Sequence, residues 1–149
     1  MVRTFVKNGA SVIATGRRFT LLKALRDELG DKVHPVELDV QDNNAVIQLI
    51  QSLPPNLKNI DVLINNAGLA LGLDPAQKSK LEDWETMVDT NIKGVLNCTH
   101  AILPGMVERN RGHVINLGSV AGEFPYPGGH VYGATKAFVH QFSLNLRAD

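Results

Sequence analysis

A tyrosine and a lysine four residues apart near the carboxyl end of the chain are the residues best suited to acid–base chemistry. In the segment YGATK, a helical backbone places Tyr132 and Lys136 one above the other on the same face. A free phenol has a pKa of about 10, but a neighbouring ammonium group favours the phenolate and lowers that pKa. Such a pair can exchange a proton near neutral pH.

The sequence around this pair decides whether it is an accidental surface pair or a site. A short β-rich run at 114–117 ends in Gly118-Ser119, so a buried parallel strand would deliver Ser119 to the carboxyl edge of a sheet. A second apolar run, 61–64, ends in the motif NNAG. Between the two runs, Asn91 lies within a long helical pattern, where asparagine competes for backbone hydrogen bonds. Polar groups from four segments therefore point to one site.

Together these motifs resemble those of the short-chain dehydrogenase/reductase family, whose members carry Asn-Asn-Ala-Gly after the fourth strand and an Asn-Ser-Tyr-Lys tetrad. The resemblance implies that Ser119 holds the substrate oxygen and that Tyr132 transfers the proton. It also implies that Asn91 bends its helix and holds a water that links Lys136 to solvent. The proton path then runs from solvent through this water, Lys136 and the ribose hydroxyl of the cofactor to Tyr132. It covers essentially all 149 residues, which correspond to somewhat over half of a family member.

Strand and helix patterns alternate along the chain, which indicates a parallel sheet covered on both faces. We expect a single domain over residues 1–149, of the α/β, doubly wound, Rossmann-like class. The expected strands are 11–14, 33–40, 62–65 and 114–117, and the expected helices are 1–7, 19–29, 43–53 (capped by Asp42 or Asn43), 81–108 and 131–149.

The doubly wound fold normally opens with a central strand and a Gly-rich phosphate turn, and this sequence has no such spacing before Ser11. We therefore expect a partial NAD(P)-binding domain that lacks the first strand, the Gly-rich loop and the last strands of the family. In that case the strands at 11–14 and 62–65 each keep one unpaired edge.

The resemblance also places the cofactor residues. Arg17 and Arg18 follow the first visible strand, where arginine can bind the 2′-phosphate of the adenosine ribose through two hydrogen bonds. No carboxylate is present there to bind a 2′-hydroxyl. NADP is therefore favoured over NAD. The alternative is that both arginines are solvated. Asp39 and Val40 resemble the adenine-binding pair of the family, although Asp39 could equally cap a helix or a loop. The remaining implied contacts are Asn66, Ala67, Gly68, Tyr132 and Lys136. The small residues in the segment 66–68 let the backbone approach a ribose.

Composition restricts the partners. The 15 basic and 15 acidic residues cancel, which gives no electrostatic reason to expect nucleic acid or an anionic membrane. No apolar run approaches the roughly 18 residues of a membrane span. A single cysteine, Cys98, favours a reducing compartment. We expect Cys98 to be a small apolar residue within a helix. The histidines have no ligand spacing, so we expect no metal. We expect His130 to be a solvated loop residue, and the alternative is that it contacts a carboxylate. A cytoplasmic enzyme that acts on a small molecule is the prediction.

Within the family, the sequence most resembles the NADP-dependent 3-hydroxy acid dehydrogenases, including the serine and allo-threonine dehydrogenases, on segments 14–18, 65–72 and 126–136. This implies hydride transfer between a nicotinamide and the alcohol or carbonyl carbon of a small 3-hydroxy acid. The helices at 81–108 and 131–147 resemble those that form tetramers in the family, which implies a homotetramer. One alternative is a catalytically silent fragment that cannot hold a dinucleotide. Another is a nucleotide-sugar epimerase or dehydratase. The resemblance of segment 69–72 to the 3-hydroxy acid dehydrogenases counts against this alternative.

Overall fold

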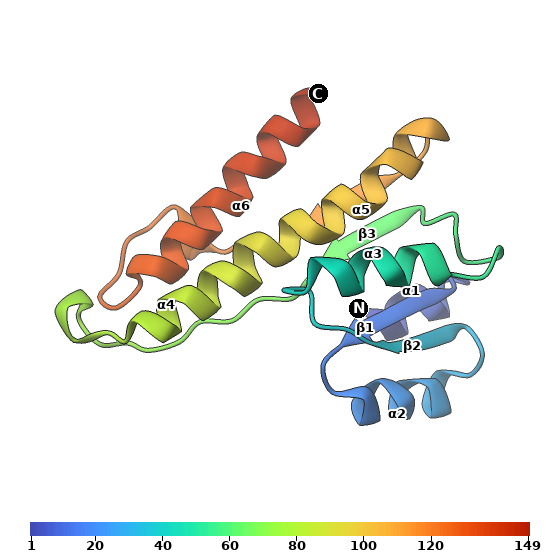
Figure 1. Cartoon of the computed structure of the whole chain (residues 1–149), viewed down its shortest axis with the longest axis horizontal. Helices are drawn as coiled ribbons and strands as arrows, with labels where there is room; N and C mark the ends of the chain where they lie inside the picture. Colours follow the sequence, from blue (N-terminus) through green and yellow to red (C-terminus); the bar gives the residue numbers. More distant parts are fainter.

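The computed structural model describes residues 1–149 and contains the alternation of strands and helices that the sequence predicts. Figure 1 shows the arrangement of the elements, coloured along the chain. The strands are β1 (Val12–Gly16), β2 (Val33–Glu37), β3 (Val62–Asn65) and β4 (His113–Asn116). The helices are α1 (Val2–Lys7), α2 (Phe19–Leu29), α3 (Asn43–Ser52), α4 (Leu81–Val88), α5 (Gly94–Glu108) and α6 (His130–Ala148), with short 3-10 turns η1 (Ala76–Lys78) and η3 (Val120–Gly122).

Local sequence signals account for several of these boundaries. The Asp42 carboxylate accepts a hydrogen bond from the Ala45 N–H at 3.0 Å, so Asp42 is the cap of α3. Gly30 follows α2 with a φ of 78°, a left-handed conformation that favours glycine and ends the helix. Helix α2 therefore begins and ends where the sequence predicts.

The four strands form two separate parallel pairs. In one pair, β1 runs beside β2 with Val12 opposite Val33, and in the other β3 runs beside β4 with Val62 opposite His113. No ladder joins β1 to β3. The prediction that each of these two strands keeps an unpaired edge is confirmed.

Some strand ends differ from the prediction. Strand β2 stops at Glu37 instead of reaching Val40, because the chain turns where the Asp39 carboxylate accepts a hydrogen bond from the Gln41 N–H at 3.0 Å. Strand β1 extends to Gly16 because its pairing with β2 continues as far as Glu37. Strand β4 begins one residue earlier than predicted, at His113, which pairs with Val62.

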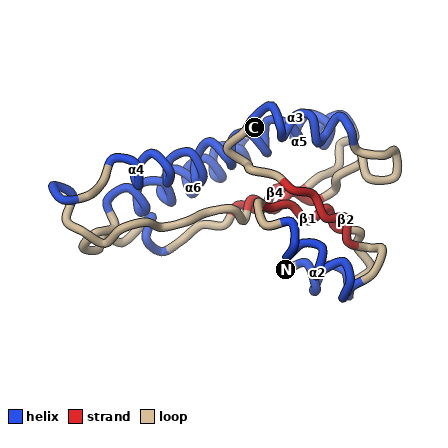
Figure 2. Tube along the Cα trace, turned by 60° about the horizontal axis from the view of Figure 1, so that its bottom comes forward, coloured by secondary structure: helices blue, strands red, loops and turns tan.

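Helices α4 and α5 form one continuous rod, because a π-helical segment, η2 (Asp89–Lys93), joins them. The rod lies beside α6 in Figure 1. The strands lie in a layer with α3 and α5 on one side and α2 on the other (Figure 2). Leu38, Val46 and Cys98 form a buried cluster between the strand layer and these helices. None of the helices combines the length and the apolar character that crossing a membrane requires.

The unpaired edges of β1 and β3 should make the chain self-associate as its concentration rises. A buried backbone group without a partner costs about 1–3 kcal/mol, and pairing between copies removes part of that cost. Lysine on an edge strand opposes such pairing, so the double variant Thr15→Lys/Val62→Lys should remain monomeric at higher concentration. Leu73→Lys, on an exposed loop residue, is the control. Sedimentation and size-exclusion chromatography measure this. A monodisperse monomer with a cooperative melt at every concentration would contradict it.

Candidate active site

Helix α6 brings Tyr132 and Lys136 together as the four-residue spacing predicts. The Lys136 Nζ lies 5.9 Å from the centroid of the Tyr132 ring. The lysine is only 7% exposed, and its ammonium donates a hydrogen bond to the Leu117 carbonyl at 2.7 Å, just beyond the end of β4. The ammonium is therefore buried and held in one place beside the ring.

Asn91, in the π-helical segment η2, connects this helix to the loop that follows β3. It is 1% exposed, and its Oδ1 accepts from the Leu69 N–H while its Nδ2 donates to the Leu69 carbonyl, both at 2.9 Å. The same Nδ2 donates to Thr135 Oγ1 at 3.0 Å. Asn91 therefore fixes the loop after β3 against the residue that precedes Lys136. Its implied water-holding role stays a prediction.

Thr135 was not anticipated from the sequence, although it lies inside the tyrosine–lysine motif. Its hydroxyl donates to the Tyr132 carbonyl at 2.8 Å and accepts from Asn91. It is fully buried. A threonine that back-bonds within its own helix looks unremarkable in a sequence, and only packing against η2 gives it a positioning role.

Gly68 lies directly against this cluster. A Cβ added at Gly68 would lie 3.4 Å from both Asn91 Oδ1 and Lys136 Nζ. A methyl group here would therefore be in close van der Waals contact with both polar groups. The small residue predicted for close approach of the backbone thus borders the Asn91 and Lys136 side chains.

Ser119 lies at the carboxyl end of β4, as predicted, and begins the turn η3. Its Oγ accepts from the Ala121 N–H at 3.2 Å and makes no hydrogen bond to the Tyr132 phenol. The turn packs closely on α6, because a Cβ added at Gly133 would lie 2.7 Å from the Ala121 carbonyl oxygen. Ser119 is thus held against the helix that carries Tyr132 and Lys136.

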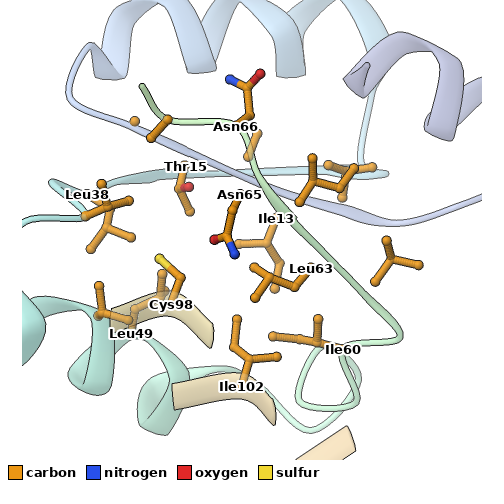
Figure 3. Close-up of a pocket in the computed structure, with 18 of the residues that line it drawn as sticks. Ile13, Thr15, Leu38, Leu49, Ile60, Leu63, Asn65, Asn66, Cys98 and Ile102 are labelled. Carbon is orange, nitrogen blue, oxygen red and sulfur yellow. The ribbon is translucent and has the colours of Figure 1, made fainter. Parts of the chain in front are cut away.

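Most of the predicted cofactor residues line one cavity of about 760 Å³ between the two strand pairs (Figure 3). Ser119, Tyr132 and Lys136 lie outside its lining, as does Arg18, which is exposed at the start of α2. The predicted residues that line it are Arg17, Asp39, Val40, Asn66, Ala67 and Gly68.

Asp39 and Val40 have structural partners in addition to their place at the cavity. The Asp39 carboxylate closes the turn to Gln41, which corresponds to the loop-capping role considered for it. The Val40 side chain packs on Gly94, where an added Cβ would lie 2.6 Å from Val40 Cγ2. Asn97 Nδ2 donates to the Val40 carbonyl at 2.9 Å. Asn97, on α5, was not anticipated and anchors this turn to the long helix.

A second asparagine network lies beneath the site and was also missed. Asn65 Nδ2 donates to Asn116 Oδ1 at 2.8 Å and to Thr99 Oγ1 at 3.1 Å. Asn116 Nδ2 in turn donates to Ser143 Oγ at 2.9 Å. The network joins β3 and β4 to α5 and α6, so polar side chains fix the carboxyl ends of these strands relative to the helices that carry the site.

His130 is not the solvated loop residue that the sequence predicts. It is the first residue of α6 and half-buried, with its ring centroid 5.2 Å from that of Trp84 in an edge arrangement. Its Nε2 lies 3.1 Å from Ser79 Oγ and 3.2 Å from the Asp74 carbonyl oxygen. The prediction failed because these partners are about 50 residues away in the sequence. His130 fastens the loop after β3 to the start of α6.

Comparison with known proteins identifies the family. Residues 1–149 match the sequence model described as short chain dehydrogenase. The chain belongs to the short-chain dehydrogenase family. It is 63% identical over 149 residues to the NADP-dependent 3-hydroxy acid dehydrogenase YdfG of Salmonella typhi, and 56% identical over 145 residues to the serine 3-dehydrogenase of Rhizobium radiobacter. These alignments cover 100% and 97% of this chain but 60% and 58% of the two relatives.

Solved structures agree with this short-chain dehydrogenase assignment. The serine dehydrogenase of Escherichia coli is 60% identical, with a TM-score of 0.97, over 99% of this chain and 67% of that chain. A closed form of serine dehydrogenase complexed with NADP+ is also 60% identical, with a TM-score of 0.98, over 99% of this chain and 60% of that chain. The predicted family and the Rossmann-like α/β class are confirmed.

Cys98 should make the stability of this short-chain dehydrogenase chain fall at high pH. Burial raises the pKa of the Cys98 thiol from 9.0 to about 11, and the residue is 8% exposed. The unfolded chain then loses this proton first, so the free energy of unfolding falls as the pH rises from about 9 to about 11. Urea denaturation followed by fluorescence of Trp84, the only tryptophan, measures it.

The matched variant is Cys98→Ala, because other groups also titrate in this range. Its free energy of unfolding should decline less between about pH 9 and about pH 11 than that of the parent chain. Identical pH dependence of the two proteins, or fast alkylation of the folded parent chain near pH 8, would show that the thiol is not held protonated by burial.

Proposed function

We propose that this chain carries the proton-transfer site and part of the cofactor site of an NADP-dependent oxidoreductase. The enzyme transfers hydride between the nicotinamide and the alcohol or carbonyl carbon of a small 3-hydroxy acid. The observation that carries the proposal is the buried Lys136 ammonium, which the Leu117 carbonyl holds beside the Tyr132 ring. The proposal is further supported by 63% identity to an NADP-dependent 3-hydroxy acid dehydrogenase.

Proton transfer in this proposal passes through Tyr132. In the oxidative direction the Tyr132 phenolate accepts the proton of the substrate hydroxyl, and in the reductive direction the phenol returns it to the carbonyl oxygen. The Lys136 ammonium stabilises the phenolate, and Ser119 Oγ holds the substrate oxygen. When bound, the nicotinamide supplies or accepts the hydride. Asn91 acts through its hydrogen bonds to Leu69 and Thr135, which hold the loop after β3 in place relative to α6.

The residues available for NADP fit a dinucleotide. The cavity runs past Arg17, whose exposed guanidinium can bind a 2′-phosphate together with Arg18, and past Asp39 and Val40 for an adenine. Asn66, Ala67 and Gly68 are exposed residues that line the cavity, as a ribose contact requires. In this proposal Tyr132 and Lys136 complete the site on the nicotinamide side.

The setting of this activity is also inferred. We take residues 1–149 as one partial NAD(P)-binding domain, and propose a homotetramer in which the rod of α4 and α5 and the helix α6 contact other subunits. A formal net charge of zero fits a small-molecule substrate in the cytoplasm, with neither nucleic acid nor a membrane as partner. A catalytically silent chain is the second candidate, and the separation of the two strand pairs favours it. Fluorescence enhancement on titration with NADPH distinguishes the two, since a silent chain gives none.

The double variant Arg17→Ala/Arg18→Ala should weaken NADPH binding much more than NADH binding. Each charge-assisted hydrogen bond to a phosphate contributes about 1.5–3 kcal/mol, so losing one from each arginine should weaken NADPH binding roughly 10²-fold to 10⁴-fold. NADH has no 2′-phosphate and should be affected little. Isothermal titration with both nucleotides measures this. Arg26→Ala, on the helix α2 that follows these two arginines and paired with Asp31, is the control. Equal losses for NADPH and NADH would rule out the assignment of these arginines.

Tyr132→Phe should abolish turnover and leave NADPH affinity nearly unchanged. The substitution removes only the hydroxyl that exchanges the proton, and loss of a general acid–base group typically costs about 10²–10⁴-fold in rate. Oxidation of L-serine and 3-hydroxy acids, followed as NADPH formation, measures turnover. Tyr126→Phe changes the only other tyrosine, which is exposed, and should retain the parent activity. Equal effects of the two variants would contradict the role of Tyr132.

A further inference from the structure

The loop between β3 and α4 is fastened to the rest of the chain by two side chains. Asn91 bonds both backbone groups of Leu69 in its first part. Residues 72–80, which we call the distal loop, are exposed except for the half-buried Ser79. The hydrogen bonds that join the distal loop to an element distant in sequence all go to His130, the first residue of α6. In Figure 1 this loop leads to the end of the molecule where α6 begins.

The hydrogen bonds of the His130 ring show which nitrogen carries the hydrogen. The Val131 N–H donates to Nδ1 at 3.0 Å, so Nδ1 has a free lone pair. The Ser79 hydroxyl donates to the carbonyls of Asp74 and Pro75 at 3.2 and 3.3 Å. Nε2 therefore carries the hydrogen and donates to Ser79 Oγ at 3.1 Å and to the Asp74 carbonyl at 3.2 Å. These partners fit the neutral Nε2–H form of the ring.

A second proton on the ring has no acceptor in this arrangement. It would lie on Nδ1 and face the Val131 N–H, and two donors cannot bond each other. The Val131 N–H would also lose its acceptor, because the first N–H groups of a helix have no carbonyl partner within it. The positive charge would lie at the N-terminus of a 19-residue helix, whose dipole disfavours a cation. Protonation therefore weakens the attachment of the ring.

No carboxylate compensates for this charge. The ring is bordered by the distal loop, by α4 through Trp84, by the segment before α6 and by the first turns of α6. None of the acidic side chains on these elements forms an ion pair with His130. The ionisable residues on them are Asp74, Lys78, Lys80, Glu82, Asp83, Glu85, Glu123, Tyr126, Tyr132 and Lys136.

The same contacts border the helical turn that carries Tyr132. Gly128, with a φ of 78°, brings the segment before α6 so close to the distal loop that an added Cβ would lie 2.6 Å from the Leu73 carbonyl oxygen. The Gly133 N–H closes the first turn of α6 on the Gly129 carbonyl at 2.6 Å. His130 lies within this turn, two residues before Tyr132. Release of the His130 ring therefore loosens the backbone on which Tyr132 is placed.

We propose that His130 is a positioning residue for Tyr132 and that it acts in its neutral Nε2–H form. The neutral ring fastens the distal loop to the first turn of α6, and protonation at Nδ1 releases both. Histidine changes its charge between about pH 5 and pH 8, so the turn is ordered at the upper end of this range and loosens at the lower end. The effect on proton transfer rests on the proposed function, whereas the fastening does not.

Trp84, the only tryptophan, reports the charge of the ring. The two ring centroids lie 5.2 Å apart, and an imidazolium quenches the emission of an adjacent indole. Emission of the chain 1–149 should therefore fall as the pH is lowered from about 8 to about 5. His130→Gln keeps an N–H donor but cannot be protonated, so its emission should stay constant. His140→Gln changes an exposed histidine of the same helix and should behave as the parent chain does.

Amide exchange at Ser79 and Gly133 measures the fastening, with all proteins compared at the same pH so that intrinsic rates cancel. At about pH 8, where the ring is neutral, His130→Leu should exchange about tenfold faster than the parent, and His130→Gln should stay close to the parent rate. At about pH 5 the parent should exchange about tenfold faster than His130→Gln, because only the parent ring takes up a proton.

Turnover separates positioning of Tyr132 from support of the loop alone. In the oxidation of L-serine with NADP, kcat of the parent should fall more steeply below about pH 7 than kcat of His130→Gln, while KM for NADP changes little. Absence of NADPH binding would count against the proposed function only, since emission and exchange are measured without cofactor. The present proposal is overturned by a pH response of Trp84 that persists in His130→Gln, by equal exchange of the parent and His130→Leu, or by identical pH profiles of kcat.

Discussion

The hydrogen bond from the Lys136 ammonium to the Leu117 carbonyl is the interaction on which the site depends. An ammonium group that is 7% exposed is costly unless it has partners, and this bond gives it one at the end of β4. The lysine is thereby kept beside the Tyr132 ring instead of reaching for solvent. Because the carbonyl belongs to the segment just after β4, the strand that delivers Ser119 also positions the lysine of α6.

Asparagine side chains connect the site to the rest of the fold through hydrogen bonds. An amide has both donors and an acceptor, so one side chain can bond a backbone N–H and a carbonyl at the same time. Asn91 does so with Leu69, and its place in a π-helical segment directs it away from the regular helix ladder toward α6. Asn97 holds the turn after β2, and Asn65 with Asn116 joins the ends of β3 and β4. Each of these amides fixes a segment that borders the proposed cofactor or proton-transfer site.

The two strand pairs are held relative to each other by helices and not by a continuous sheet. Helix α5 packs on α3 and on β3, and the buried cluster of Leu38, Val46 and Cys98 bridges from the end of β2 to α5. This arrangement keeps the carboxyl ends of the strands together, so six of the nine predicted cofactor residues line a single cavity, and Arg18, Tyr132 and Lys136 do not. It also leaves the facing edges of β1 and β3 open. The same gap therefore bears on stability and on cofactor binding.

The sequence alone determined the order of elements, the parallel pairing, the family and the spacing of Tyr132 and Lys136, because periodicity, capping residues and local motifs act over a few residues. The bounds of α2 followed from such signals, which also gave Asp42 as one of two cap candidates for α3, whereas the unpaired strand edges followed from the strand order of the doubly wound fold. Tertiary structure decided what depends on contacts distant in sequence. It put His130 against Ser79 and Asp74, gave Thr135 its partner in Asn91, and placed Asn65 and Asn97 in networks. A side-chain amide, hydroxyl or imidazole reveals its role only through its partners, and folding alone brings those partners within hydrogen-bond distance.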